Sequence, residues 1–173
     1  MHTLIFQKEK KLTILTRCMR KHKFTLLLLA LGLSLFSQGI YIFAKAELAQ
    51  YLIERAWHTK LRTGEEMPPW PWADTHTIGK LTLADHSWYV LAGASARNLA
   101  FAPTHVSASV SPGQLGNSVI VGHRDTQFSQ LQHLKSGDII KMENLRGLHK
   151  FKVISTRVTH VSQIQYLYQE EQP

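Results

Sequence analysis

The pattern of apolar and polar positions divides the chain into a helical N-terminal part and a β-rich remainder. An uncharged apolar run of 21 residues extends from Phe24 to Ala44, which is long enough to cross a hydrocarbon core of roughly 30 Å as a helix. Apolar residues then recur at helical spacing from Leu48 to Leu61. They predict a juxtamembrane helix in residues 45–66, ended by Gly64.

A proline- and tryptophan-rich stretch separates this helix from the rest. Residues 67–76 read MPPWPWADTH, and prolines at this density exclude a helix or a central strand. We interpret the stretch as an extended linker. Trp70 and Trp72 are expected to pack against the domain as anchors; the alternative is that they recognise a ligand.

Short strands predominate from residue 77 onward, which favours a mainly β barrel or sandwich. Alternation and β-branched runs predict strands at residues 77–83, 87–91, 119–121, 139–142 and 151–154, with residues 158–161 as a candidate extension of the last one. Two short helices are expected at 93–99 and 128–134, the first capped by Ser95 and the second by Asp125 or Thr126. The β-rich domain thus covers residues 77–161, followed by a polar tail, 162–173.

Charge changes the picture at the N-terminus only. Residues 1–23 hold seven Lys/Arg against one acidic residue, whereas the chain from Lys45 onward holds 13 against 11. The folded part is therefore close to neutral, and without a basic stripe we expect no nucleic-acid partner. The positive-inside rule predicts a cytoplasmic tail at 1–23, a signal anchor at 24–44 and a domain outside the cytoplasm. A cleaved signal peptide is the alternative, since Ala44-Lys45-Ala46 resembles a cleavage site.

The candidate chemistry centres on His123. It follows the apolar run Val119-Ile120-Val121 and Gly122, so it lies where a strand predicted to be buried ends, a place where rigid scaffolds present catalytic groups. A purely structural histidine is the alternative. The ten histidines show no HExxH motif and no i,i+4 pair, and the only cysteine is Cys18. We therefore expect no zinc site, no other cofactor and no internal disulfide.

The segment NSVIVGHRDTQF, residues 117–128, resembles the catalytic-histidine segment of sortases. Residues 91–103, LAGASARNLAFAP, and the pair Gly137-Asp138 support the likeness in the same order. The PWPWAD run at 69–74 is similar to the type found in marine and other Gram-negative proteobacteria. The resemblance extends from about residue 68 to about residue 159.

This resemblance implies a membrane-anchored cysteine transpeptidase built on a β-barrel. Sortases cleave a sorting signal near the C-terminus of a secreted or membrane protein through a thioester and transfer the acyl group to an amine. The reaction needs a cysteine nucleophile, a histidine acid/base and an arginine that holds the developing oxyanion. His123 matches the family's histidine. The implied partners are a sorting-signal peptide and the inner membrane, with the domain in the periplasm.

The chain departs from the family pattern beyond residue 159. No TLxTC segment is present, Cys18 precedes the apolar run, and neither Arg124 nor Arg157 matches the family's arginine. Arg124 and Asp125 are instead expected to fix the loop around His123. We expect a sortase-like β-barrel that lacks its last strands, with exposed edges, and a C-terminally truncated chain that is inactive and only marginally stable by itself.

Two non-enzymatic hypotheses stay open. One is an extracytoplasmic binding module that keeps the peptide groove without the nucleophile. The other is an anchored assembly protein in which the barrel is only a scaffold, because a fold alone does not define a function. The sorting motif and the acceptor amine cannot be deduced from the sequence.

Overall fold

A computed structural model of the chain describes residues 2–160, with side chains from His22 onward. Its first element is the long helix α1, His2–Thr63. The apolar stretch predicted as an anchor lies within it, with its side chains exposed. By length and composition, the part of α1 from His22 onward could cross a membrane. The separate juxtamembrane helix predicted at 45–66 is the C-terminal part of this same helix, which ends before Gly64.

Gly64 ends α1 as expected. Its φ is +74°, and its N–H donates to the Lys60 carbonyl at 2.8 Å. A left-handed residue at this point is the usual way to satisfy the last carbonyls of a helix, and glycine adopts it without strain.

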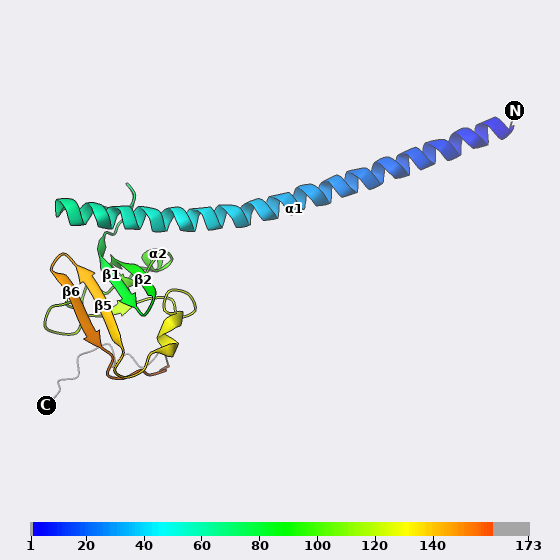
Figure 1. Cartoon of the computed structure of the whole chain (residues 1–173). Helices are drawn as coiled ribbons and strands as arrows, with labels where there is room; N and C mark the ends of the chain where they lie inside the picture. The colour runs from blue at the N-terminus through cyan, green and yellow to red at the C-terminus, as the bar shows by residue number, and fades with distance from the viewer. Residues whose placement is uncertain (1, 161–173) are drawn as a thin grey trace. The chain divides into compact units, whose positions relative to one another are not determined.

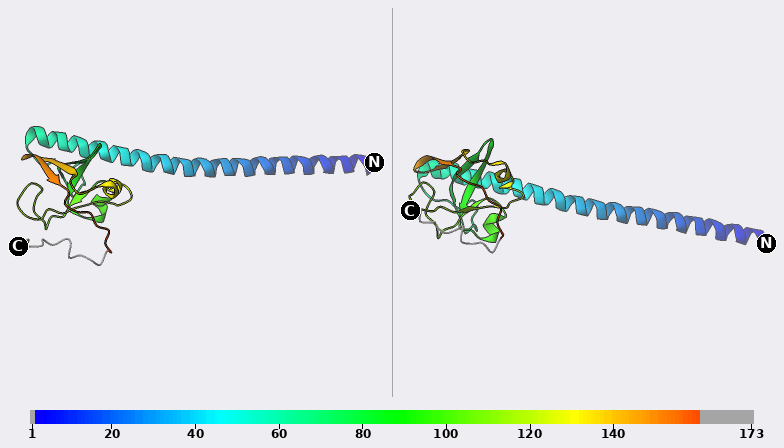
Figure 2. Two further views of the ribbon diagram at one scale, coloured as in Figure 1. Left: turned by 60° about the horizontal axis from the view of Figure 1, so that its bottom comes forward. Right: turned by 90° about the horizontal axis from the view of Figure 1, so that it is seen from below.

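The residues after α1 form a six-stranded mixed sheet in the described part of the chain (Figure 1). The strands lie in the order β4-β3-β2-β1-β5-β6, and the sheet curls into a half-barrel (Figure 2). All neighbours are antiparallel except β2 and β3. The strands are β1 (Thr77–Leu83), β2 (His86–Ala92), β3 (Thr104–His105), β4 (Ile120–Val121), β5 (Ile139–Asn144) and β6 (Gly147–Lys152).

The sheet buries side chains on both faces. On one face Ile53 of α1 packs with Leu91 and Ala102, and Trp70, Tyr89 and Phe101 surround them; we call this the helix-side cluster. On the other face Leu81, Val90 and Met142 form the inner cluster. Adjacent residues of a strand point to opposite faces, so β2 supplies Val90 to one cluster and Leu91 to the other.

Several polar contacts hold the last turns of α1 on the sheet. Lys60, 5% exposed, donates from Nζ to the Thr77 carbonyl at 3.0 Å and to Glu66 Oε1 at 3.2 Å. The Tyr89 hydroxyl donates to Glu54 Oε1 at 3.0 Å. The end of α1 is therefore part of the folded domain.

The structure corrects some of the expected elements. The strand before His123 is only two residues long, half-buried, and at one edge of the sheet, so the prediction of a buried strand is wrong. The helix expected at 128–134 is a 3₁₀ helix, η1 (Ser129–His133), whose N-terminus receives no side-chain cap, so Asp125 and Thr126 do not cap it. The hairpin expected at 139–154 forms β5 and β6 with a tighter turn, and residues 158–160 form no strand.

The linker tryptophans differ from each other. Trp70 packs edge-on against Phe101, with ring centroids 5.1 Å apart, as an anchor should. Trp72 is 78% exposed, so the packing predicted for it is wrong. The helix capped by Ser95 is confirmed as α2 (Ala96–Leu99), where the Ser95 hydroxyl accepts from the Asn98 N–H. Residue 161 and the polar tail at 162–173 lie outside the described residues.

Candidate functional site

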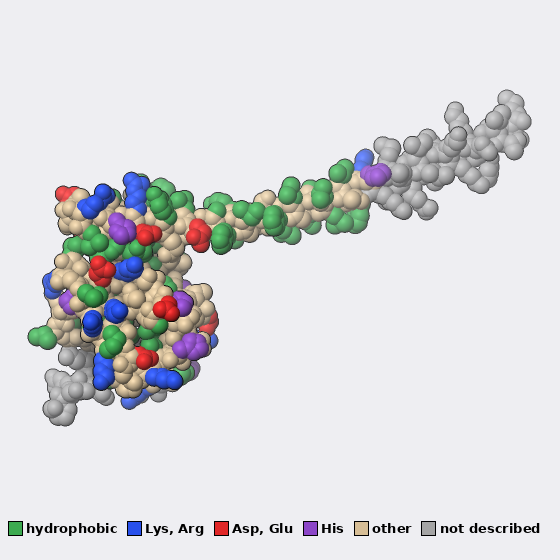
Figure 3. All heavy atoms as spheres, viewed as in Figure 1, with side chains coloured by type: hydrophobic (Ala, Val, Ile, Leu, Met, Phe, Trp, Pro, Cys, Tyr) green, Lys and Arg blue, Asp and Glu red, His purple; other side chains and the backbone are tan. Residues whose placement is uncertain are grey.

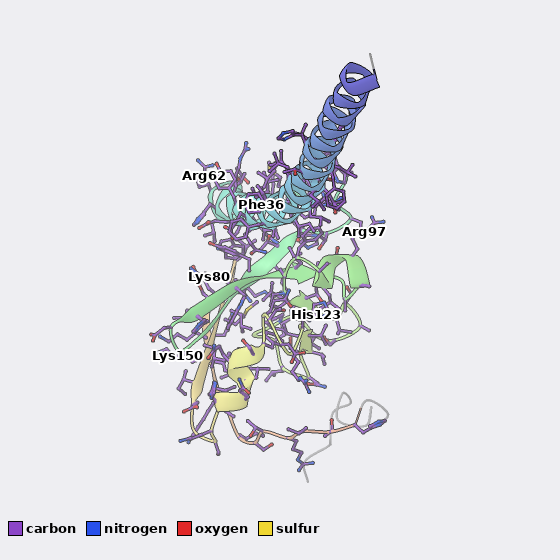
Figure 4. All side chains as sticks on the ribbon, turned by 90° about the vertical axis from the view of Figure 1, so that its right-hand side faces the viewer. Phe36, Arg62, Lys80, Arg97, His123 and Lys150 are labelled. Carbon is purple, nitrogen blue, oxygen red and sulfur yellow. The ribbon has the colours of Figure 1, made fainter. Side chains whose placement is uncertain are left out.

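His123 lies just beyond β4, on the segment that leaves the sheet (Figure 4). Both of its backbone groups are bonded. Its N–H donates to Gln127 Oε1 at 2.9 Å, and its carbonyl accepts from the Phe128 N–H at 3.0 Å. The residue itself is exposed. The chain thus fixes the backbone of His123 and leaves its imidazole accessible, which is the arrangement that an acid/base group needs.

An aromatic side chain supports the residue before His123. A Cβ built on Gly122 would lie 2.9 Å from two ring carbons of Phe128, so the glycine admits the ring against the backbone. Phe128 in turn meets Trp88 of β2 edge-on, with ring centroids 6.3 Å apart. The turn that carries His123 is therefore anchored on the inner face of the sheet.

A polar bridge supports the same turn from another direction. Gln127 accepts from His123 with Oε1 and donates from Nε2 to the Leu99 carbonyl, at 3.0 Å. Leu99 is the last residue of α2, and that helix is held by Asn98, 5% exposed, whose Nδ2 donates to the carbonyls of Ala92 and Gly93. The predictions from the sequence missed Gln127. Its place inside the NSVIVGHRDTQF segment was the only available signal.

The Arg124-Asp125 pair does not anchor the loop as expected. Arg124 Nε lies 2.9 Å from Asp125 Oδ1, but both side chains are more than 80% exposed and bond to each other. An exposed ion pair between neighbours in the chain contributes little to order. The loop is held by Gln127 and Phe128 instead.

An apolar cavity of about 290 Å³ lies on the inner face, beside the turn. Its lining comes from five strands, β1, β2, β4, β5 and β6, and from the segments around β4. It includes Phe128 and Ile120, on either side of His123 in the chain. Ser118 also lines it, and the Ser118 hydroxyl is buried without a hydrogen-bond partner in the described structure. The wall is completed by Leu81, Leu83, Trp88, Pro112, Leu131, Ile140, Met142 and Phe151.

A second histidine, His105 on β3, is buried in a structural network. Its Nε2 lies 2.9 Å from the Val110 carbonyl and 3.1 Å from Ser109 Oγ. The Ser109 hydroxyl already donates to the Val106 carbonyl and accepts from the Val119 N–H. This hydroxyl is therefore committed to holding the loop before β4, and the pair is not a nucleophile with its base.

No group of three or more metal-ligating side chains occurs in the part of the chain that the structure describes. Sortase chemistry would need a thiol near His123. The only cysteine is Cys18, so no residue from His22 to His160 supplies that thiol.

Comparison with known proteins decides the family. The model of the Sortase domain matches residues 80–173, which is more than half of the chain and includes His123. The chain belongs to the sortase family. No curated protein matches it.

Solved sortase structures share the fold. The sortase D5 transpeptidase of Clostridium perfringens superposes with a TM-score of 0.59 at 19% identity, covering 72% of this chain and 82% of that one. Clostridium perfringens sortase C, solved with the C-terminal cell wall sorting motif, gives 0.51 at 17% identity and covers 73% and 75%. The pilus-related sortase C of Group B Streptococcus gives 0.49 at 24% and covers 53% and 52%, so this chain spans about half of its length.

The resemblance seen in the sequence is thus confirmed at the level of family and fold. The half-barrel is a sortase-like fold with an incomplete barrel: β4 and β6 are its edges in the described residues.

Proposed function

We propose that this chain is the anchor and histidine-bearing part of a membrane-anchored, sortase-type cysteine transpeptidase. The observation that carries the proposal is the Sortase-domain match over residues 80–173. Within it, His123 lies just beyond β4, with its backbone bonded and the residue exposed.

His123 is the proposed acid/base group. Imidazoles ordinarily titrate near neutral pH, so one such ring can protonate a leaving amine and later deprotonate the incoming one. Neither step requires a metal or an organic cofactor. The rigid turn limits the backbone motion of His123, which favours a fixed position relative to the reacting atoms.

The nucleophile is the part of the mechanism that residues 1–173 do not place near His123. Cys18 precedes the apolar stretch, whereas His123 follows it. If that stretch spans the bilayer, a hydrocarbon core of roughly 30 Å separates the two groups. We therefore propose that these 173 residues alone do not catalyse transpeptidation.

The proposed substrate is the C-terminal sorting-signal peptide of a secreted or membrane protein. One neighbour in the comparison, Clostridium perfringens sortase C, was solved with such a motif. The acyl acceptor in this scheme is an amine.

The proposed anchor is the apolar stretch from Phe24 to Ala44, whose exposed apolar side chains are visible along the helix in Figure 3. The basic residues before it favour an N-terminus in the cytoplasm, which places the domain in the periplasm and the chain in the inner membrane.

The only cysteine allows a direct test of orientation. In spheroplasts a membrane-impermeant maleimide should leave Cys18 unlabelled until the membrane is permeabilised. In the variant Cys18→Ser/Ser107→Cys, which carries its thiol at an exposed position of the domain, labelling should occur without permeabilisation. The reverse pattern would refute the orientation, and extraction of the protein by alkaline carbonate would refute the anchor.

Function is tested with the full chain in detergent and a set of synthetic peptides that copy the C-termini of secreted proteins from the same organism. We expect saturable binding of a subset by fluorescence polarisation, and no cleavage by mass spectrometry with or without an added amine. Turnover would refute the proposed inactivity, and the absence of any binding would refute the peptide site.

A non-catalytic, extracytoplasmic peptide-binding or assembly module is the second candidate, and the location of Cys18 favours it. The reading frame beyond the codon for Pro173 separates the two. A TLxTC segment followed by an arginine codon would support the enzyme, whereas their absence would support the module.

A further inference from the structure

We propose that Gln127 is a positioning residue for His123, and that it holds the acid/base histidine in register with the end of α2. The inference rests on the proposed function of His123. It concerns a residue to which neither the family match nor the fold assigns a role.

The geometry assigns both ends of the Gln127 amide. Oε1 faces a backbone N–H, that of His123, and Nε2 faces a backbone carbonyl, that of Leu99. Only one orientation of the amide satisfies both contacts, because an N–H can only donate and a carbonyl can only accept. The side chain of Gln127 therefore joins the backbone of His123 to that of Leu99, a residue 28 positions before Gln127 in the sequence.

The first bond restricts the residue that carries the chemistry. The His123 carbonyl is already held by the Phe128 N–H, and Thr126 N lies 3.4 Å from the same oxygen. The Gln127 bond fixes the other side of the His123 peptide, its N–H. With both groups bonded inside the turn, the Cα–Cβ direction of His123 is set by the backbone.

The second bond connects that turn to the segment after β2. Leu99 ends α2, and α2 is fixed by the Ser95 cap and by the buried Asn98 amide. The exposed Arg124 and Asp125 side chains bond to each other instead of to α2. A displacement of α2 would therefore be transmitted to His123 through Gln127.

Two substitutions separate these bonds. Gln127→Met keeps the length of the side chain and removes both. Gln127→Glu keeps an acceptor for the His123 N–H and loses the donor to Leu99. The matched control is Gln132→Met, because Gln132 is exposed on η1. All four proteins are compared as full chains in detergent.

The readout is the backbone amide of His123, measured by ¹⁵N relaxation and by hydrogen exchange. We expect an order parameter typical of rigid backbone, about 0.85, in the unmodified chain, in Gln132→Met and in Gln127→Glu, and a value below about 0.6 in Gln127→Met. Amide exchange at His123 should be about fivefold faster in Gln127→Met, as expected for one net hydrogen bond. In Gln127→Glu, only the residues at the end of α2 should become more mobile.

An unchanged His123 amide in Gln127→Met would refute the proposal. So would an equal response to Gln132→Met, since that would indicate a general loosening of the turn. These results do not depend on peptide binding, so a chain that binds no peptide but shows the expected amide response would refute the proposed function and leave the role of Gln127 standing.

Discussion

The two faces of the half-barrel differ in how completely they are covered. On the helix side, the last turns of α1 lie over the sheet, and Ile53 and Leu91 have no exposed surface. On the inner side, the Leu81-Val90-Met142 cluster borders a cavity of about 290 Å³, and Phe151 at its rim is 42% exposed. The core on the helix side is therefore fully covered, whereas the described residues leave the core on the inner side partly uncovered.

The candidate site lies on the open side. Phe128, which supports the turn of His123, contributes to the cavity wall, and the edge strands β4 and β6 pair with one neighbour each in the described sheet. The helix side thus holds α1 on the sheet, while the inner side supports the turn that carries His123.

The largest expected effect tests the helix side. Trp57 of α1 is 1% exposed, so Trp57→Ala should lower the free energy of unfolding by about 3–5 kcal/mol. Urea denaturation followed by circular dichroism measures this. The matched control is Trp72→Ala, which should cost less than about 0.5 kcal/mol because Trp72 is 78% exposed. Equal losses for the two variants would contradict the assignment of α1 to the folded domain.

An intermediate effect tests the pairing of β1 with β5. A Cβ at Gly79 would collide with the Glu143 carbonyl and with Met142 Cε. Gly79→Ala should therefore cost about 1–3 kcal/mol, as overpacking does. Gly32→Ala is the control, because that position has nothing within 4 Å of a new Cβ. If Gly79→Ala were as stable as the control, the approach of the two strands would be wrong.

Ser118 offers a smaller test of the inner side. Its hydroxyl is buried in an apolar cavity without a partner in the described structure, and an unsatisfied group of this kind costs about 1–3 kcal/mol. Ser118→Ala should consequently be neutral or raise the free energy of unfolding by about 1 kcal/mol. A clear loss of stability would show that the hydroxyl is bonded.

The smallest effect concerns the pH dependence of stability. Burial lowers the pKa of His76 from 6.5, assisted by the positive charge of Lys60, although Glu66, 3.2 Å away, acts in the opposite direction. The unfolded chain therefore binds this proton more tightly, and the free energy of unfolding should fall as the pH falls below about 6.5. Urea midpoints of His76→Asn should show a smaller decrease over this range; an identical decrease would contradict the assignment.

Local patterns predicted much of the sheet. Alternation placed β1 at 77–83, turn residues placed the β1–β2 hairpin, and Ser95 was correctly expected to cap α2. These features depend on residues that are neighbours in the sequence.

Features that depend on distant partners were not predicted. β3 has only two residues, Thr104 and His105, and exists because β2 and β4 pair with it. The hydrogen bond from Gln127 to Leu99 joins residues that are 28 positions apart. No pattern in the sequence around Gln127 predicts Leu99 as its partner. His123 itself was proposed as a site residue from its motif, whereas the residues that hold its backbone required the structure.

We propose that His123 is the acid/base residue of a sortase-type peptide site. The most direct measurement follows the imidazole resonances of His123, assigned through His123→Ala, while the set of C-terminal peptides is added to the full chain in detergent. We predict that binding peptides shift the His123 resonances and leave those of His133, exposed on η1, unchanged. Peptides that bind without moving the His123 resonances would contradict the claim.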